Sequence, residues 1–227
     1  MPFATFNPQN FQGPFRPRKS IILASASPRR QALLTDLGLH FTVLPCTSPE
    51  PNPEPDEPAG EYVQRMALLK ARSAAKTKRP GIILAADTVV RADQHILGKP
   101  KSSAQALDML NELNAATHTV QTGCCLLDQE KEDAPYLFAV STQVTFSRHS
   151  PEVLKSYAQT GEPMGKAGGY AIQGAGSFLV SHINGSYTNV VGLPLNQTLS
   201  ALMDMQAIAL PYSLTTELGR EFGQDDE

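Results

Sequence analysis

The sequence contains no long hydrophobic run. None of its apolar stretches approaches the roughly 20 residues of a membrane-spanning helix, and its beginning lacks the apolar core of a signal peptide. We therefore expect a cytoplasmic protein that has no membrane partner.

Cysteine is scarce, with three residues in a chain of 227. Cys124 and Cys125 are neighbours in an apolar run and Cys46 stands apart, a pattern that favours small buried side chains in a reducing compartment over a disulfide framework. The five histidines are scattered without the spacing of metal ligands, so the sequence gives no indication of a zinc site.

The net charge is also small, with a formal value of -3 at pH 7 and a pI near 6.0. This balance produces no overall field that would attract nucleic acid, and we expect no nucleic-acid partner. An anionic ligand would have to be held by a local cluster of basic side chains.

The sequence does contain enough apolar residues for one sizeable core, since 41% of its 227 residues are hydrophobic. We expect a disordered extension over residues 1–19, a single domain over 20–204 and a partly disordered tail over 205–227. Strands and helices mix without strict alternation, and no internal repeat is present, which predicts an α/β fold with a mixed sheet. The expected elements are a strand at 21–23, a helix at 29–37, a strand at 40–44, a helix at 60–76, a strand at 81–86, a β-ribbon at 88–97, a helix at 102–113, strands at 117–127 and 136–146, a helix from Pro151 to near Gly161, a hairpin turned at Asn184-Gly185 and a last helix opened by Pro194.

The strongest local signal is the string Ser25-Ala26-Ser27-Pro28-Arg29-Arg30. Ser27 suits the N-cap of a helix and Pro28 its first position, so both arginines fall in the first turn. Cations there oppose the helix dipole unless an anion lies between them, and the free N–H groups of a helix N-terminus bind phosphate. The pattern favours a phosphate site; arginines that bend to solvent or to neighbouring carboxylates are the alternative.

Two lysines are candidates for further phosphate contacts. Lys70 continues a row of apolar residues at helical spacing that includes Val63 and Met66, so it faces the core or the rim of a cleft. A side chain that snorkels to solvent is the alternative. Lys99 is followed by Pro100, which restricts its direction more than that of an average surface lysine.

Two acids are candidates for metal ligands. Asp87 directly follows the near-continuous apolar strand 81–86, and open α/β sheets place their ligand sites outside strand ends. We expect Asp87 to be a metal ligand or a general base; an aspartate that caps a turn is the alternative. Glu50, one of several acids in the proline-rich loop 46–59, offers a second oxygen for Mg²⁺, which takes one or two protein carboxylates.

Taken together, these segments resemble the Maf family of nucleoside triphosphate pyrophosphatases from about Ile21 to about Leu202. The matching pieces are Leu23-Ala24-Ser25-Ala26-Ser27-Pro28-Arg29-Arg30, Glu50, Lys70-Ala71, Ala86-Asp87-Thr88, Lys99-Pro100, Lys166-Ala167-Gly168, Tyr170-Ala171-Ile172-Gln173-Gly174, Gly185-Ser186-Tyr187 and Asn189-Val190-Val191-Gly192-Leu193-Pro194-Leu195. The resemblance implies a fold like that of inosine triphosphate pyrophosphatases, in which a mixed, elongated sheet with flanking helices forms two lobes around a central cleft, usually in a homodimer.

The resemblance also implies a role for each residue. The side chains that would hold the triphosphate are Ser25, Ser27, Arg29, Arg30, Lys70 and Lys99. Glu50 and Asp87 would position Mg²⁺ or Mn²⁺, and Asp87 would be the base for a water that attacks the α-phosphorus and expels pyrophosphate. Phosphoryl transfer needs positioning and charge neutralisation more than covalent chemistry, so these groups suffice.

Three residues match family positions associated with the choice of base, namely Arg29, Thr88 and Gln173. The glutamine amide donates and accepts, which fits the N3–H donor and O4 acceptor of uracil or thymine. The Gln173 segment therefore resembles the branch that acts on dTTP and UTP.

The sequence departs from the family pattern at Pro49, Ser102 and Gly165, where many members have acids. The loss of three carboxylates leaves open a second hypothesis, a nucleotide-binding regulator of cell division with weak or no turnover. A third hypothesis is a preference for modified or methylated nucleotides, although Gln173 argues against a methylated guanine.

Overall fold

The structure, a computed structural model, describes residues 13–46, 49–93, 95–131 and 135–210 and confirms a mixed α/β fold. Its strands are β1 (Arg16–Pro17), β2 (Ile21–Leu23), β3 (Thr42–Val43), β4 (Ile82–Ala92), β5 (His95–Leu97), β6 (Thr117–Asp128), β7 (Tyr136–Phe146), β8 (Val180–Asn184) and β9 (Ile208–Ala209). Its α-helices are α1 (Pro28–Asp36), α2 (Ala59–Ala75), α3 (Ser103–Leu113), α4 (Pro151–Gln159), α5 (Tyr187–Val191) and α6 (Leu195–Asp204), and its 3₁₀ helices are η2 (Ala167–Gly169) and η3 (Gly174–Leu179).

One mixed sheet runs through the molecule in the order β3-β2-β4-β6-β7-β8, with β5 also paired to β4. β2 is parallel to β3 and β4, whereas the pairs β4–β6, β6–β7 and β7–β8 are antiparallel. β2 pairs with residues 82–84 of β4 and β5 pairs with residues 90–92. Between these two partners, in the part of the chain that the structure describes, residues 85–89 have a strand neighbour only on the β6 side.

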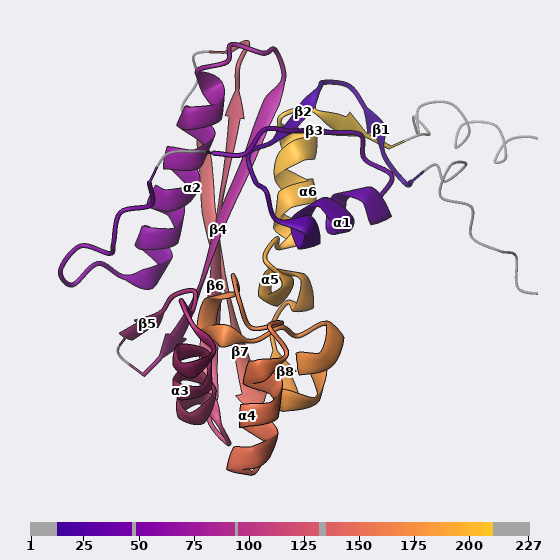
Figure 1. The fold of residues 1–227 in the computed structure, drawn as a ribbon. Coiled ribbons are helices and arrows are strands. Elements are labelled where there is room, and N and C mark those ends of the chain that lie inside the picture. The colour runs from indigo at the N-terminus through magenta and orange to yellow at the C-terminus, as the bar shows by residue number, and fades with distance from the viewer. Residues whose placement is uncertain (1–12, 47–48, 94, 132–134, 211–227) are drawn as a thin grey trace, which may run out of the picture.

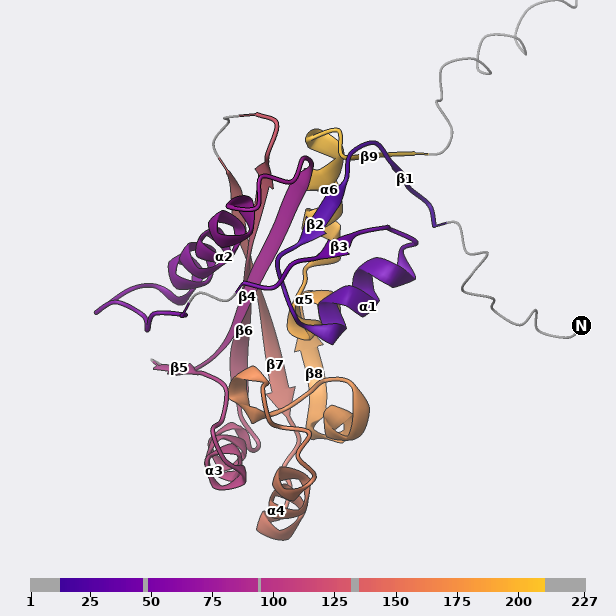
Figure 2. The ribbon, with the colours of Figure 1, turned by 45° about the horizontal axis from the view of Figure 1, so that its top comes forward.

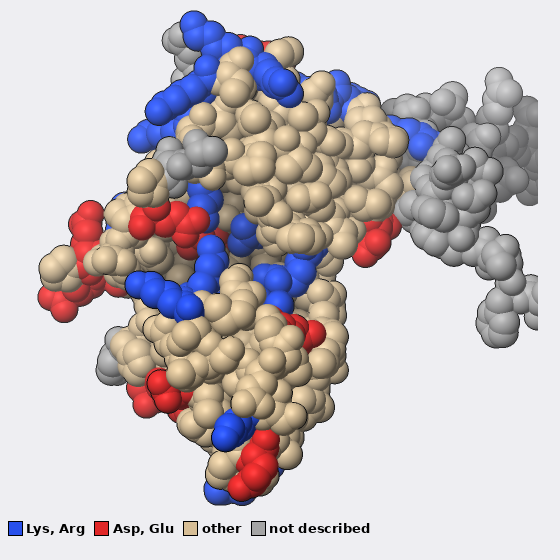
Figure 3. All heavy atoms as spheres, in the orientation of Figure 1, with Lys and Arg blue, Asp and Glu red and all other residues tan. Residues whose placement is uncertain are grey.

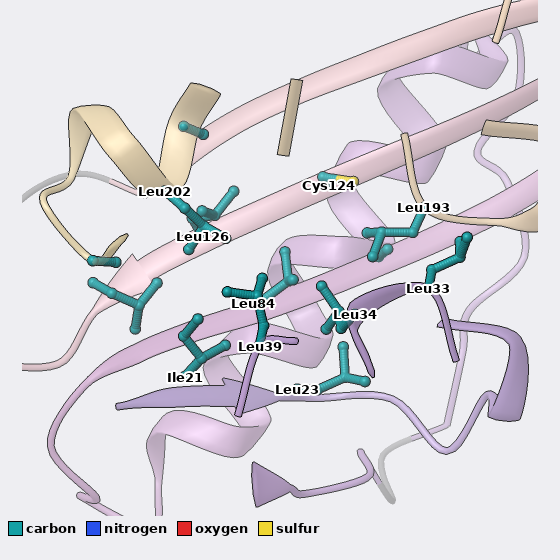
Figure 4. Packing of buried hydrophobic residues seen from close by; sticks show 14 of the residues in the cluster. Ile21, Leu23, Leu33, Leu34, Leu39, Leu84, Cys124, Leu126, Leu193 and Leu202 are labelled. Atoms are coloured by element: carbon teal, nitrogen blue, oxygen red, sulfur yellow. The ribbon is translucent and has the colours of Figure 1, made fainter. Parts of the chain in front are cut away.

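Helices cover both faces of the sheet in one half of the molecule, with α2 on one side and α1 and α6 on the other (Figures 1 and 2). Successive side chains of β4 point to opposite faces of the sheet, as expected of a strand. Ile82 and Leu84 belong to the cluster under α1 and α6 that Figure 4 shows, and Ile83 and Ala85 belong to the cluster under α2. In the other half, α3 and α4 enclose a third core with the far ends of β4, β6 and β7.

Most expected elements are present, but two expectations are wrong. The expected strand 81–86 and the first arm of the ribbon are one strand, β4, because β6 pairs with it without interruption from Ile82 to Arg91. The expected hairpin at Asn184-Gly185 does not form: β8 ends at Asn184, Gly185 takes a φ of 129°, and the Ser186 side chain caps α5 by accepting a hydrogen bond from the Asn189 N–H.

The ends of the described chain lie together, because β1 pairs with β9. The expected disorder at residues 1–12 and 211–227 lies outside the described residues, and the division into 1–19, 20–204 and 205–227 stays a prediction. Cys124 and Cys125 are fully buried in two of the cores, as their apolar surroundings predicted. No helix in the described ranges has the length and apolarity needed to cross a bilayer.

Candidate active site

A pocket of about 380 Å³ lies beside residues 85–89 of β4, and all ten residues that the sequence analysis proposed for binding, catalysis or a metal line it. These residues are Ser25, Ser27, Arg29, Arg30, Glu50, Lys70, Asp87, Thr88, Lys99 and Gln173. The volume falls within the range of roughly 300–1,000 Å³ that is usual for small-molecule sites. Basic and acidic side chains gather around a hollow between the two halves of the molecule (Figure 3). The sequence therefore identified groups that meet in space although 148 positions separate Ser25 from Gln173.

The buried guanidinium of Arg30 binds the edge of β4 at residues 85–89, where β4 has no strand neighbour on that side among the described residues. Its Nη1 donates to the Ala86 carbonyl at 2.9 Å and to Ser25 Oγ at 3.1 Å, and its Nη2 donates to Thr88 Oγ1 at 3.0 Å. Its Nε donates to the Gly192 carbonyl at 2.7 Å. Four of the five N–H groups therefore form hydrogen bonds inside the protein. These bonds connect α1 to the segment after β2, to β4 and to the end of α5.

Arg29 and Ser27 remain closer to the surface at the N-terminus of α1. Ser27 is the N-cap residue, as predicted, but its side chain makes no capping hydrogen bond; its N–H is bonded instead to Ser25 Oγ at 3.2 Å. Arg29 is partly exposed and donates one long hydrogen bond, 3.4 Å, from Nε to the Val191 carbonyl. The first turn of α1 therefore presents a hydroxyl and a partly exposed guanidinium to the pocket.

The other wall of the pocket carries two carboxylates that share one ammonium group. Lys70 Nζ lies 2.5 Å from Asp87 Oδ1 and 2.9 Å from Glu50 Oε1. Lys99 Nζ is 3.9 Å from the other oxygen of Glu50. Lys70 and Asp87 are buried, whereas the side chains of Glu50 and Lys99 are 41% and 56% exposed, so this cluster reaches from the sheet to solvent.

Close packing of α2 against the sheet brings Lys70 to Asp87. Asp87 is paired across the ladder with Gly123 of β6. A Cβ atom on Gly123 would lie 2.4 Å from the main-chain carbon of Val63 in α2, so any side chain there would push the helix away. The absence of a side chain at residue 123 therefore sets the distance across which the lysine and the aspartate meet.

The surroundings shift the pKa values of several charged groups. Burial lowers the pKa of both Arg29 and Arg30, and for Arg30 the nearby Asp87 opposes that effect. Burial works against ionisation of Glu50, but the positive charges of Lys70, Lys99 and Arg30 outweigh it and hold the pKa of this carboxyl below its usual value. The pocket thus combines partly desolvated cations with an ionised acid.

A relay of hydroxyl groups lies behind Thr88. Thr88 Oγ1 accepts from Arg30 and is 2.9 Å from Thr122 Oγ1, which donates to the Asn189 carbonyl at 3.0 Å. Because Thr122 uses its proton on Asn189, Thr88 is the donor between the two threonines. The side chain of Asn189, fully buried, donates to the Val120 carbonyl and to Thr142 Oγ1. Sequence reasoning missed this support, since Thr122 lies within a strand that showed no unusual feature.

Part of the pocket wall is apolar. It includes Tyr170, Ala171 and Ile172, which directly precede Gln173 in the chain, and the pocket is also lined by Val90, Val120, Val190 and Val191. Gln173 itself is exposed at the pocket. A polar amide next to an apolar wall is suited to a flat ring that carries hydrogen-bonding groups on its edge.

The three departures from the family pattern have separate structural settings. Ser102 caps α3, where its Oγ accepts from the Gln105 N–H at 3.2 Å. Gly165 lines the pocket with a φ of 72°, and a Cβ there would meet no atom within 4 Å among the described residues. Pro49 directly precedes Glu50 and is exposed.

Comparison with known proteins adds an independent line of evidence. Residues 20–205 match the family described as Maf-like protein. The chain is 44% identical over 196 residues to a protein named dTTP/UTP pyrophosphatase from Nitratidesulfovibrio vulgaris, covering 86% of this chain and 92% of the relative. It is 46% identical over 189 residues to a protein of the same name from Citrifermentans bemidjiense, covering 83% and 97%. The solved structure of the Staphylococcus aureus Ham1 protein is also similar, with a TM-score of 0.49 and 14% identity over 82% of this chain and 100% of that chain.

The family match covers most of the chain, and both relatives are matched over more than nine-tenths of their own length. The pocket brings together the residues to which the family resemblance assigns a role. The chain therefore belongs to the Maf family.

Proposed function

We propose that this chain is a nucleoside triphosphate pyrophosphatase that hydrolyses dTTP or UTP to the nucleoside monophosphate and pyrophosphate. The observation that carries the proposal is the convergence of four basic side chains, two carboxylates and one glutamine on a single pocket. Three relatives named dTTP/UTP pyrophosphatase, between 42% and 46% identical to this chain, support the same activity. None of these names supports the alternative of a regulator without turnover.

In this proposal the triphosphate lies between the N-terminus of α1 and the two lysines. Arg29, Ser27 and the first-turn N–H groups of α1 bind phosphate oxygens on one side, as helix N-termini do. Lys99, whose ammonium is largely exposed, binds them on the other side. Arg30, with four of its N–H groups already engaged, shapes the site and contributes charge.

Asp87 is the general base in the proposed reaction. Lys70 holds Oδ1 of this carboxylate at 2.5 Å, which leaves Oδ2 to take the proton of the attacking water. The water then adds to the α-phosphorus while the bond to the pyrophosphate oxygen breaks. Arg29 and the lysines neutralise the charge that collects on the leaving group.

Glu50 and Asp87 are the residues that would hold a divalent cation, Mg²⁺ or Mn²⁺. Both carboxylates lie within ion-pair distance of the same ammonium group, so the two acids lie close together on one wall of the pocket. Two carboxylates fit a hard cation that takes its other ligands from water and phosphate oxygens. When bound, the cation supplies positive charge at the phosphates and lowers the pKa of water.

In this proposal the base lies against the apolar wall of the pocket, and the Gln173 amide forms hydrogen bonds with the edge of the base. The amide oxygen of Gln173 can accept a hydrogen bond from N3–H of uracil or thymine, and its –NH₂ group can donate one to O4. Thr88 and Arg29, which also line the pocket and match family positions associated with the choice of base, complete this part of the proposal.

The test is a panel of dTTP, UTP, dCTP, dATP and dGTP with Mg²⁺, in which pyrophosphate and orthophosphate are measured separately. We expect one pyrophosphate for each monophosphate formed, the highest kcat/KM for dTTP or UTP, and no turnover after chelation of the metal. Orthophosphate as the first product would contradict the proposed bond cleavage. Tight binding of dTTP without hydrolysis would support the regulator instead.

We also infer that the protein is a cytoplasmic homodimer, because the family resemblance implies a dimer and the sequence is typical of a reducing compartment. Sedimentation or light scattering on the full chain measures the oligomeric state. A mass equal to that of one 24.5 kDa chain would contradict the dimer.

A further inference from the structure

We propose that Glu162 is a positioning residue for base recognition: together with Tyr157, its carboxylate fixes the main chain of residues 171–176, which carries Gln173. The inference rests on the proposed function, in which Gln173 reads the base. Glu162 is not among the residues that line the pocket, so it acts through this segment.

The Glu162 carboxylate binds the start of η3 with both oxygens. Oε1 accepts from the Ala175 N–H at 2.9 Å, and Oε2 accepts from the Gly176 N–H at 2.8 Å. These N–H groups belong to the first turn of η3, directly after Gln173. A carboxylate that accepts from two main-chain donors is a charge-assisted cap, which is stronger and more directional than a neutral hydrogen bond.

Two glycines make this close approach feasible. Gly174 has a φ of 76°, and a Cβ there would lie 2.3 Å from Oε1 of Glu162. A Cβ on Gly176 would lie 2.3 Å from the hydroxyl oxygen of Tyr157. Gly174 and Gly176 therefore let the main chain pack against two side chains.

Tyr157 of α4 holds the other end of the segment. Its hydroxyl oxygen accepts from the Ala171 N–H at 3.2 Å. The same hydroxyl is hydrogen bonded to Glu162, and after burial this bond is the next strongest cause of the raised pKa of Tyr157. One connected network of Glu162 and Tyr157 thus fixes the main chain on both sides of Gln173.

The surroundings of Glu162 favour the ionised form of its carboxyl group. Burial alone would raise the pKa of its carboxyl, but the hydrogen bonds from Tyr157, Gly176 and Ala175 outweigh burial and hold the pKa below its usual value. An ionised Glu162 keeps both oxygens as acceptors, as the geometry of the two N–H groups requires.

The position of this segment matters because Gln173 must meet the base while the triphosphate is held at α1. Without its hydrogen bonds to Glu162 and Tyr157, this segment could move, and the distance between Gln173 and the triphosphate would no longer be fixed. The pocket would then accept a larger two-ring base nearly as well as a one-ring base. The network therefore acts on the choice of substrate and leaves the reacting groups near Asp87 in place.

The first experiment is Glu162→Gln, which keeps the shape of the side chain but turns an –NH₂ group toward one of the donors. We expect KM for dTTP to rise by on the order of 10-fold and the preference for dTTP over dGTP to fall by a similar factor. We expect kcat for dTTP to stay within about 2-fold of the wild-type value. Glu152→Gln, an exposed acid on α4, is the matched control and should change none of these values.

A double-mutant cycle with Gln173→Ala separates positioning from general loss of structure. If Glu162 acts through Gln173, adding Glu162→Gln to Gln173→Ala lowers the substrate preference no further. Losses that multiply in the double variant, or a fall in kcat that is equal for all triphosphates, would overturn the proposal. If Glu162→Gln does not fold, Tyr157→Phe takes its place, with Tyr136→Phe at an exposed tyrosine as its control.

The same measurements tell the two proposals apart. A wild-type enzyme without preference for dTTP, or a Gln173→Ala variant that keeps that preference, would refute the base recognition on which this inference rests, and the inference would fall with it. A preference that Gln173→Ala abolishes and Glu162→Gln leaves intact would refute the positioning role alone.

Discussion

Arg29 and Arg30 are adjacent in the chain but have different surroundings. Arg30 is 9% exposed and donates four hydrogen bonds inside the protein. Arg29 is partly exposed and makes one long hydrogen bond to a main-chain carbonyl. The first holds the site together, and the second is available to a ligand.

This difference predicts unequal effects of the same substitution. Arg30→Lys cannot reproduce a planar fork that reaches four acceptors, so we expect it to lower the free energy of unfolding by about 2–4 kcal/mol. Arg29→Lys should cost less than about 1 kcal/mol and should raise KM for the triphosphate. Urea denaturation and steady-state kinetics measure both. Equal losses of stability in the two variants would contradict the division of roles.

At Asp87 we expect the largest effect on the chemical step. Asp87→Asn keeps the size of the side chain but removes the proposed base, so kcat should fall by about 10²–10⁴-fold, a range typical of general bases. Asp108→Asn, at an exposed position of α3, is the matched control. A single-turnover assay of pyrophosphate release measures the step, and a variant that retains more than about one-tenth of the rate would exclude Asp87 as the base.

At the scale of single residues, the sequence predicted which side chains gather at the pocket but not how each is used. The types and order of Ser25, Asp87 and Gln173 were sufficient to indicate a shared site. The internal use of Arg30 depends on the Gly192 carbonyl, which lies 162 positions along the chain. No local pattern reports such a contact, because it is set by the packing of α5 against α1.

Among the secondary-structure elements, α3 shows how a departure from the family pattern is accommodated. Ser102 occupies its N-cap, where an acid is common in the family, and its hydroxyl accepts from the Gln105 N–H. The cap therefore has a local role in the helix that either a hydroxyl or a short carboxylate fulfils.

Two substitutions test this interpretation. Ser102→Ala should lower the free energy of unfolding by about 1 kcal/mol, whereas Ser102→Asp should leave it nearly unchanged, because aspartate caps helices as well as serine does. Thermal unfolding of both variants gives the comparison. Equal destabilisation by alanine and aspartate would mean that the cap contributes little.

The boundaries of β4 illustrate the limit of sequence analysis for whole elements. Asp87-Thr88 interrupts the apolar run, and polar residues in that position predicted the end of a strand. The strand continues because β6 supplies a partner along its whole length, and because Lys70 and Thr122 provide partners for the two polar side chains. A strand pairing between distant segments thus overrides the local signal.

At the scale of the whole molecule, the core enclosed by α3 and α4 contains a buried histidine. His118 is 3% exposed, and its Nε2 lies 2.8 Å from the hydroxyl oxygen of Tyr170, a residue of the pocket wall. Burial lowers the pKa of His118 to about 4, from a usual value of 6.5. The imidazole is therefore neutral in the folded protein at pH 7.

This histidine predicts a dependence of stability on pH. As pH falls from 6.5 towards 4, the unfolded chain binds a proton at residue 118 and the folded protein does not, so the free energy of unfolding decreases. One proton gives a slope of up to about 1.4 kcal/mol per pH unit and about 3 kcal/mol in total. His118→Gln, which keeps a partner for Tyr170, should reduce the slope in urea denaturation between pH 4.5 and 6.5. Identical slopes for the two proteins would contradict the assignment.

Residues 85–89 of β4, which have a strand neighbour only on the β6 side, should exchange their amide hydrogens with solvent at unequal rates. The carbonyls of Leu84 and Ala86 point away from β6, where they accept hydrogen bonds from Ala24 and Arg30. Because successive residues of a strand point their main-chain groups to alternate sides, the N–H of Thr88 also points away from β6, and the N–H of Asp87 points to β6. Two consecutive amides should therefore exchange deuterium at very different rates, slowly at Asp87 and rapidly at Thr88. Deuterium uptake at Thr88 that slows when dTTP is added would show the nucleotide lying along this stretch, and uptake at both sites that dTTP leaves unchanged would show it lying elsewhere.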